Sequence, residues 1–242
     1  MSVPCILPSP LFVGGASVTP GTKAVLDLPL TELSDGTIIR LPIVVINGAR
    51  PGPRLYVGAA IHGDEATGVS IIAGVIKDLD PQALSGSIIA VPVQHPLAFH
   101  ADHRIPVSQF MKSPLDQAPI DAWTCFPGDS EGNLSQQLAA KLFELIKLCS
   151  FAFDIHTPTR GGRYVPISIL PGPSLGDNGK KALWLAEQCS RLVEVDGNLD
   201  DLTVTDQRFL GEQNLFARYD VRHLDDADGP IALGDHPNDP HL

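Results

Sequence analysis

Two histidines and one glutamate stand where a metal ion could be bound. The segment Ile61-His62-Gly63-Asp64-Glu65 follows an apolar run and precedes a helical pattern, and His156 ends another apolar run. An imidazole and a carboxylate three residues apart can converge on one cation, and Gly63 allows a sharp turn between them. A catalytic zinc typically takes three protein ligands and leaves one position for water. The pattern therefore predicts one Zn²⁺ per chain, bound by His62, Glu65 and His156.

Asp154 lies two residues before His156, on the same face of the predicted strand. A carboxylate in this position can orient a ligand histidine, and Asp154 is also our candidate for proton transfer in catalysis. The alternative is structural, because an H-x-x-E pattern alone is weak and a histidine after a strand is often a hydrogen-bonded scaffold residue. The residues alone leave both interpretations open.

Three further side chains are candidates for substrate binding. Arg160 and Arg163 follow His156 in the glycine-rich stretch TPTRGGR, where they could bind an anionic group at the rim of a pocket. Trp123 lies in the long proline-rich stretch of residues 95–130, and loops of that length are usually functional. It could form an apolar or stacking wall. Solvated arginines and a structural tryptophan are the alternatives.

Alternating strand and helix patterns must position these side chains. A hairpin is expected around Ser34-Asp35-Gly36, and a later amphipathic stretch carries apolar residues at helical spacing. The alternation predicts an α/β fold with a largely parallel or mixed sheet. We expect strands at residues 23–30, 37–46, 55–61, 87–93, 151–155 and 164–170, and helices at residues 65–79, 134–149 and 178–192.

Composition narrows the classes of partner. The chain has 242 residues and a formal net charge of −11, which argues against nucleic acid as a partner. Its apolar runs are too short to cross a bilayer, and its first 15 residues do not resemble a signal peptide. Four widely spaced cysteines indicate free thiols, so we expect a cytoplasmic protein. The sequence does not indicate an oligomeric state.

The domain organisation is predicted as three parts. Residues 1–48 are expected to form a leader and β-hairpin region, residues 49–210 an α/β domain with the zinc site, and residues 211–242 an acidic, poorly ordered tail.

Four ordered motifs between about residues 21 and 170 resemble the succinylglutamate desuccinylase/aspartoacylase family, which is related to the zinc carboxypeptidases. They are PLTELSDGTIIRLPIVVINGARPGPRLYVGAAIHGDEATGV, LDPQALSGSIIAVPVQHPLAF, FPGDSEGNLSQQLAAKLFELI and FDIHTPTRGG. The resemblance implies a carboxypeptidase-like mixed sheet flanked by helices and one zinc. It places the family's ligands on His62, Glu65 and His156, and implies hydrolysis of an amide bond in an N-acyl amino acid.

Two departures from the family pattern qualify this expectation. Trp123 and Thr124 stand where the family has an Asn-Arg pair that grips a substrate carboxylate, and threonine cannot form that bidentate clamp. The C-terminal β segment with the family's general-base glutamate is not found, so we expect it to be missing or truncated. Arg104 matches an arginine that often precedes the Asn-Arg motif, and is our candidate for stabilising the oxyanion.

The sequence thus predicts a zinc-dependent deacylase acting on a small acylated amino acid or similar amine. Two alternatives stay open. One is a zinc esterase or peptidase of the same fold, because one activated water can attack either carbonyl. The other is a catalytically impaired or truncated family member that only binds zinc.

Overall fold

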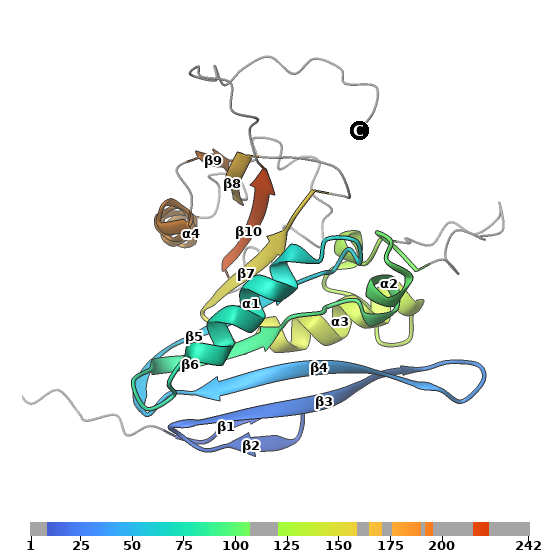
Figure 1. Ribbon diagram of the computed structural model, residues 1–242, viewed down its shortest axis with the longest axis horizontal. Helices are drawn as coiled ribbons and strands as arrows, with labels where there is room; N and C mark the ends of the chain where they lie inside the picture. The colour runs from blue at the N-terminus through green and yellow to red at the C-terminus, as the bar shows by residue number, and fades with distance from the viewer. Residues whose placement is uncertain are drawn as a thin grey trace, which may run out of the picture.

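One mixed sheet of eight strands runs through the described part of the chain (Figure 1). The computed structural model describes residues 9–106, 121–158, 165–170, 176–189, 192–195 and 215–222. The strand order is β3 (Thr22–Glu32), β4 (Ile38–Asn47), β6 (Ser85–Val91), β5 (Arg50–Ala59), β7 (Phe151–His156), β10 (Leu215–Arg222), β8 (Val165–Leu170) and β9 (Leu192–Val195). The α/β class is confirmed.

The centre of the sheet is parallel, and its flanks contain antiparallel pairs. Strands β6, β5, β7 and β10 are parallel neighbours, while β3, β4 and β8 each pair antiparallel with a neighbour. Parallel neighbours end at the same edge of a sheet, which is where open α/β folds place their sites. The ends of β5 and β7 are therefore adjacent, as the predicted metal site requires.

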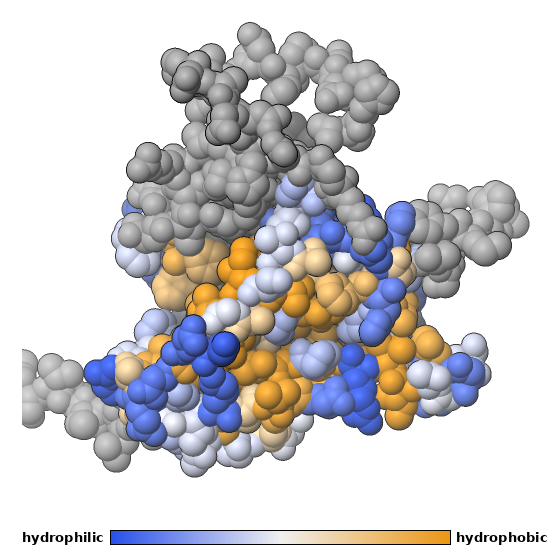
Figure 2. All heavy atoms as spheres, viewed as in Figure 1, coloured by the Kyte–Doolittle hydropathy of each residue, from blue (hydrophilic) through white to orange (hydrophobic). Residues whose placement is uncertain are grey.

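Helices cover both faces of the central strands. Helix α1 (Thr67–Asp78) packs on one face, where Ile72 contacts a small cluster with Ala59 and Ala90. Helix α3 (Leu134–Ile146) packs on the other face, where Leu138 and Leu142 join the main core. Figure 2 shows apolar surface on the side that α1 covers, and Val75 of this helix remains 59% exposed.

Successive side chains of β5 point to opposite faces of the sheet, so this strand contributes to the core on each side. Tyr56 belongs to the main core beside α3, and its neighbour Val57 packs into the cluster beside α1. This is the period of two that a strand buried on both faces requires.

Helix α3 begins as the sequence predicts. The Asn133 side chain accepts a hydrogen bond from the Gln136 backbone N–H, and the Gln136 side chain accepts one from the Asn133 N–H. This capping box satisfies two donors that a helix start would otherwise leave unpaired. The predicted helix at residues 134–149 is confirmed, with its end at Ile146.

Several local expectations differ from the structure. Residues 9–20 contain a small antiparallel hairpin, β1 (Leu11–Val13) and β2 (Ala16–Val18), rather than only a loose leader. The loop predicted at residues 95–130 contains α2 (Pro96–Ala101) and the short 3-10 helix η2 (Ala122–Cys125). Helix α4 (Gly176–Cys189) matches the third expected helix.

The predicted domain limits stay predictions. β4 pairs with β6, so the hairpin region and the hydrolase region share one sheet. β10 comes from the segment predicted as a tail, and it pairs with β7 and β8. None of the helices in the described ranges is both long and apolar enough to cross a membrane.

Candidate metal centre

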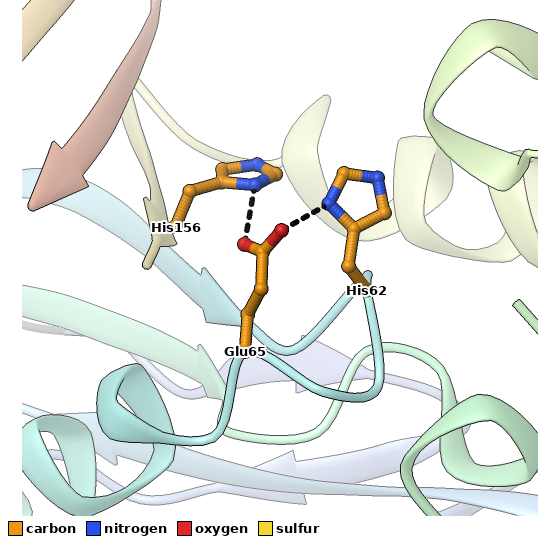
Figure 3. Close-up of side chains that lie close together, drawn as sticks. All are labelled: His62, Glu65 and His156. Atoms are coloured by element: carbon orange, nitrogen blue, oxygen red, sulfur yellow. Dashed lines mark hydrogen bonds and ion pairs between the residues drawn. The ribbon is translucent and has the colours of Figure 1, made fainter. Parts of the chain in front are cut away.

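The three predicted ligands meet at the carboxyl end of the central strands (Figure 3). His62 lies in the loop after β5, and His156 is the last residue of β7. Glu65 lies two residues before α1, so the expectation that it sits in the first helical turn is corrected. A backbone hydrogen bond of 3.2 Å from the Glu65 N–H to the His62 carbonyl closes the turn between them.

Two backbone features shape the loop that carries His62. Ala60, which is buried, has a φ of +50°, a left-handed conformation that is uncommon for a residue with a side chain. Gly63 lies so close to α2 that an added Cβ would be 2.0 Å from the Ala98 carbonyl oxygen. Backbone strain of this kind is found disproportionately at functional sites. The loop is therefore held in one specific shape against α2.

The Glu65 carboxylate lies between the two imidazoles. Its Oε1 is 2.8 Å from His62 Nδ1, and its Oε2 is 2.9 Å from His156 Nδ1. The Thr157 backbone N–H also donates to Oε2, at 3.1 Å. One ligand atom from each of the three residues lies within 4.8 Å of the others.

A second carboxylate faces the outer nitrogen of each histidine. Asp154 Oδ2 is 2.8 Å from His156 Nε2, and Asp121 Oδ2 is 3.3 Å from His62 Nε2. A carboxylate at Nε2 favours the tautomer with its proton there, which leaves the Nδ1 lone pair for a cation. Both histidines therefore offer the nitrogen that points toward Glu65.

This arrangement fits a bound cation. With protons on both Nε2 atoms, the Nδ1 lone pairs would face the Glu65 oxygens at 2.8 and 2.9 Å, and such acceptors repel unless a positive charge lies between them. Three carboxylates also gather here, of which Glu65 and Asp154 are buried, and this is costly without compensating charge. Two imidazoles and a carboxylate are a donor set that suits zinc.

The pKa values show the same demand for positive charge. Burial raises the pKa of Glu65, but the contacts with His156 and His62 outweigh burial and lower it to about 2. Burial lowers the pKa of His62, but the contacts with Asp121 and Glu65 outweigh it and raise the pKa above its ordinary value. The site thus stabilises an ionised Glu65 and favours a cation beside it.

The two predicted catalytic residues lie on different sides of the centre. Arg104 is 41% exposed, and its guanidinium lies 3.6 Å from Glu65 Oε1 and 3.3 Å from Asp121 Oδ2. Asp154 is almost fully buried, and both its oxygens are occupied, one by His156 and one by the Gln94 Nε2 at 2.5 Å. Arg104 can reach the open side of the centre, whereas Asp154 lies behind His156.

The predicted substrate-binding residues are described only in part. The Trp123 ring lies beside both ligand histidines, with ring centroids 6.1 Å from His62 and 6.3 Å from His156. Arg160 and Arg163 lie outside the described residues.

Sequence reasoning missed three residues around the centre. Asp121 lies two residues before Trp123, and no spacing in the sequence links it to His62. Tyr56 and Gln94 are buried polar residues in apolar surroundings, but no sequence spacing links them to Asp154. Within the described residues, His62, Glu65 and His156 are the one group of three or more metal-binding side chains this close together.

Known structures share this fold. An aspartoacylase family protein from Mesorhizobium loti is 23% identical with a TM-score of 0.67, and the match covers 90% of this chain and 65% of that one. A succinylglutamate desuccinylase from Silicibacter is 19% identical with a TM-score of 0.69, covering 88% and 62%. The product-bound ectoine utilization protein EutE (DoeB) from Ruegeria pomeroyi is 21% identical with a TM-score of 0.64, covering 88% and 62%.

The present chain spans less than two thirds of the length of these three proteins. No functionally curated protein sequence matches it at a significant level. The family described as "Succinylglutamate desuccinylase/Aspartoacylase catalytic domain" matches residues 51–191, which include all three candidate ligands. Because the matched residues make up more than half of the sequence, the chain belongs to the succinylglutamate desuccinylase/aspartoacylase family.

Proposed function

We propose that this protein is a zinc-dependent hydrolase that cleaves the amide bond of an N-acyl amino acid or a similar small acylated amine. The observation that carries the proposal is that both Nδ1 atoms lie beside the Glu65 carboxylate, with one ligand atom of each of the three residues within 4.8 Å of the others. Membership of a family of hydrolases supports the reaction class. That this shorter chain has the hydrolase activity of its longer relatives is part of the proposal.

His62, Glu65 and His156 would hold the zinc, one ion per chain. When bound there, zinc supplies a Lewis acid for the substrate carbonyl and lowers the pKa of a bound water to about 7. The ligand side chains fix the geometry, and the carboxylates of Asp121 and Asp154 hold the two imidazoles in the required orientation.

Arg104 is our proposed residue for stabilising the oxyanion. Its guanidinium already lies beside Glu65 and Asp121 on the partly exposed side of the centre. A positive donor there can stabilise the negative charge that develops on the carbonyl oxygen. Trp123 would form one wall of the substrate site, because its ring lies next to both ligand histidines. Arg160 and Arg163 remain proposed contacts for an anionic substrate group.

Asp154 is better suited to positioning than to proton transfer. A general base must lie within hydrogen-bond reach of the proton that it removes, directly or through one water. Both Asp154 oxygens are occupied, and the side chain is about 1% exposed. We therefore propose that Asp154 orients His156, and we assign no general base.

A peptidase or esterase with the same centre is the second candidate. Trp123 and Thr124 stand where the family has its Asn-Arg clamp for a substrate carboxylate, so the usual amino-acid recognition is altered. One structural match, 15% identical with a TM-score of 0.51, is a putative metallopeptidase from Shewanella amazonensis.

Metal content and turnover test the proposal together. Purified protein is expected to contain about one zinc per chain. His62→Ala and His156→Ala should each abolish stoichiometric binding, because each removes one of three bonds. His100→Ala is the matched control, since this histidine is exposed on α2, and it should retain full zinc.

A substrate panel then separates the candidates. N-acyl amino acids, N-acyl amines, esters and short peptides should be tested on zinc-loaded protein, with His156→Ala as the blank. Hydrolysis of the acyl amides supports the deacylase, and preference for peptides or esters supports the second candidate. Full zinc in both histidine variants would show that the site is assigned wrongly, and zinc without turnover on any class would indicate a binding protein.

A further inference from the structure

A buried line of hydrogen bonds runs from the main core to His156. The Tyr56 hydroxyl donates to Gln94 Oε1 at 2.7 Å, and Gln94 Nε2 donates to Asp154 Oδ1 at 2.5 Å. The other Asp154 oxygen lies 2.8 Å from His156 Nε2. All four side chains are buried, so water does not supply these contacts from the surface.

The strand register places the members of this line. Tyr56 and Gly58 on β5 lie opposite Ala152 and Asp154 on β7. Gln94 follows β6, and its backbone N–H donates to the Ala59 carbonyl at 2.9 Å. The Gln94 amide then passes directly over Gly58, where an added Cβ would lie 2.6 Å from Gln94 Cδ. Gly58 is therefore the residue that leaves room for this amide between the strands.

The line has one consistent direction. An ionised carboxylate only accepts hydrogen bonds, so the Gln94 amide must turn its NH₂ group toward Asp154. Its carbonyl oxygen then faces Tyr56 and accepts from the hydroxyl. With Oδ1 occupied by Gln94, the Asp154 Oδ2 atom is directed at His156 Nε2 and requires a proton there.

We propose that Tyr56 and Gln94 are positioning residues that fix His156 as the Nε2–H tautomer and thereby present its Nδ1 to the metal. The tautomer part stands on the hydrogen-bond geometry, and the metal part rests on the proposed function. Burying four polar groups in the core is costly unless every one is satisfied. If these side chains only filled space, apolar side chains could do so without the free-energy cost of burying polar groups.

The tautomer can be measured directly. Protein labelled with ¹⁵N-histidine is studied by NMR without metal at about pH 9, roughly 2.5 units above the ordinary histidine pKa. Glu65→Ala is the background for this measurement, because without a cation the Glu65 carboxylate would itself attract a proton to His156 Nδ1. The His156 signal is the one missing from His156→Ala. This background should show a proton on Nε2 alone, and the next two substitutions are added to it. Gln94→Met, which keeps the volume but removes both hydrogen bonds, and Tyr56→Phe should show a mixture of tautomers.

Zinc affinity, measured by competition with a chelator, is the second readout. Outer partners of metal-bound histidines typically contribute 10–100-fold to affinity, so Gln94→Met should lose about that much. Tyr56→Phe removes one neutral hydrogen bond and should lose about fivefold. Ile89→Val is the matched control: Ile89 is buried on β6 and pairs with Tyr56 in register, but lies outside the line. It should lower stability without changing affinity or tautomer.

Each outcome decides the proposal. A proton on His156 Nδ1 in the Glu65→Ala background, or an unchanged tautomer and affinity in both variants, would overturn it. If Gln94→Met does not fold, Tyr56→Phe decides alone, because it removes a single atom. If wild type binds no zinc, the proposed function fails, while the NMR result still settles the tautomer.

Discussion

The two histidines of the candidate centre have similar partners in very different surroundings. On the His156 side, the outer carboxylate is Asp154, which comes from a strand and is tied to Gln94 in the interior. On the His62 side, the outer carboxylate is Asp121, which precedes η2, is 20% exposed and also contacts Arg104. One half of the centre is sealed, and the other half faces solvent.

This difference suggests a division of work between the halves. Strand register and buried hydrogen bonds hold the sealed half with little freedom, which suits a group that must orient a ligand. The open half combines a partly exposed carboxylate, a partly exposed arginine and the Trp123 ring, which suits contact with a substrate. The comparison predicts that changes on the sealed side affect metal affinity, whereas changes on the open side affect turnover.

The largest difference is expected between Asp154→Asn and Asp121→Asn. In Asp154→Asn, Gln94 and His156 both donate toward a side chain with only one acceptor oxygen, so one buried donor is left unpaired. Zinc affinity should fall about 10–100-fold. In Asp121→Asn, water can reach the site and replace the lost contact, so the loss should stay below about threefold. Chelator competition on both variants measures the ratio.

Equal losses of zinc affinity in Asp154→Asn and Asp121→Asn would contradict the comparison. They would show that the solvent exposure of the outer carboxylate does not affect metal binding. The control is Asp27→Asn, since Asp27 is a half-exposed carboxylate that pairs with Arg40 on β3 and β4, away from the centre. It should bind zinc like wild type.

Arg104→Ala should separate turnover from metal binding. Removing this guanidinium takes away a proposed oxyanion donor, and kcat/KM on any accepted substrate should fall about tenfold, less than for a fully buried donor. Zinc affinity should stay the same or rise, because a positive charge beside Glu65 and Asp121 repels a cation. Initial rates and chelator competition on one preparation give both values.

The conservative variant sharpens this result. Arg104→Lys retains the charge but loses the planar fork, so it should recover only part of kcat/KM. Arg40→Ala, a half-exposed arginine on β4, is the matched control and should change neither quantity. A tenfold loss of zinc affinity in Arg104→Ala would contradict the assignment of Arg104 to the substrate side.

The sequence predicted the helices and strands that can be recognised from the spacing of apolar residues close together in the chain. Apolar runs indicated β5 and β7, and the apolar stripe at helical spacing indicated α3, because periodicity depends on neighbouring residues. The meeting of His62, Glu65 and His156 could also be predicted, since strand ends that follow apolar runs gather at one edge of a parallel sheet.

Contacts between distant residues could not be predicted in the same way. Gln94 meets Asp154 only because β6, β5 and β7 are adjacent in that order. No residue type in the sequence indicates this strand order. Asp121 meets His62 from a part of the sequence that has no periodic pattern. β9 (LVEV) and β10 (LFARYDVR) were not predicted, because they are short and the sequence around them is acidic and rich in turn residues. Tertiary pairing outweighs the local pattern there.

The smallest effect is expected from Asn133→Ala at the start of α3. This helix packs against η2, which follows Asp121 and carries Trp123, so it supports the open half from behind. Losing the cap should cost about 1 kcal/mol of unfolding free energy, measured by urea denaturation. Zinc affinity should not change, because the ligands belong to the loop after β5, the turn before α1 and the end of β7. A matched fall in affinity would show that the centre depends on overall stability rather than on its two sets of partners. Asn133→Ser, which keeps a capping oxygen, should restore most of the stability and distinguishes loss of the cap from loss of packing.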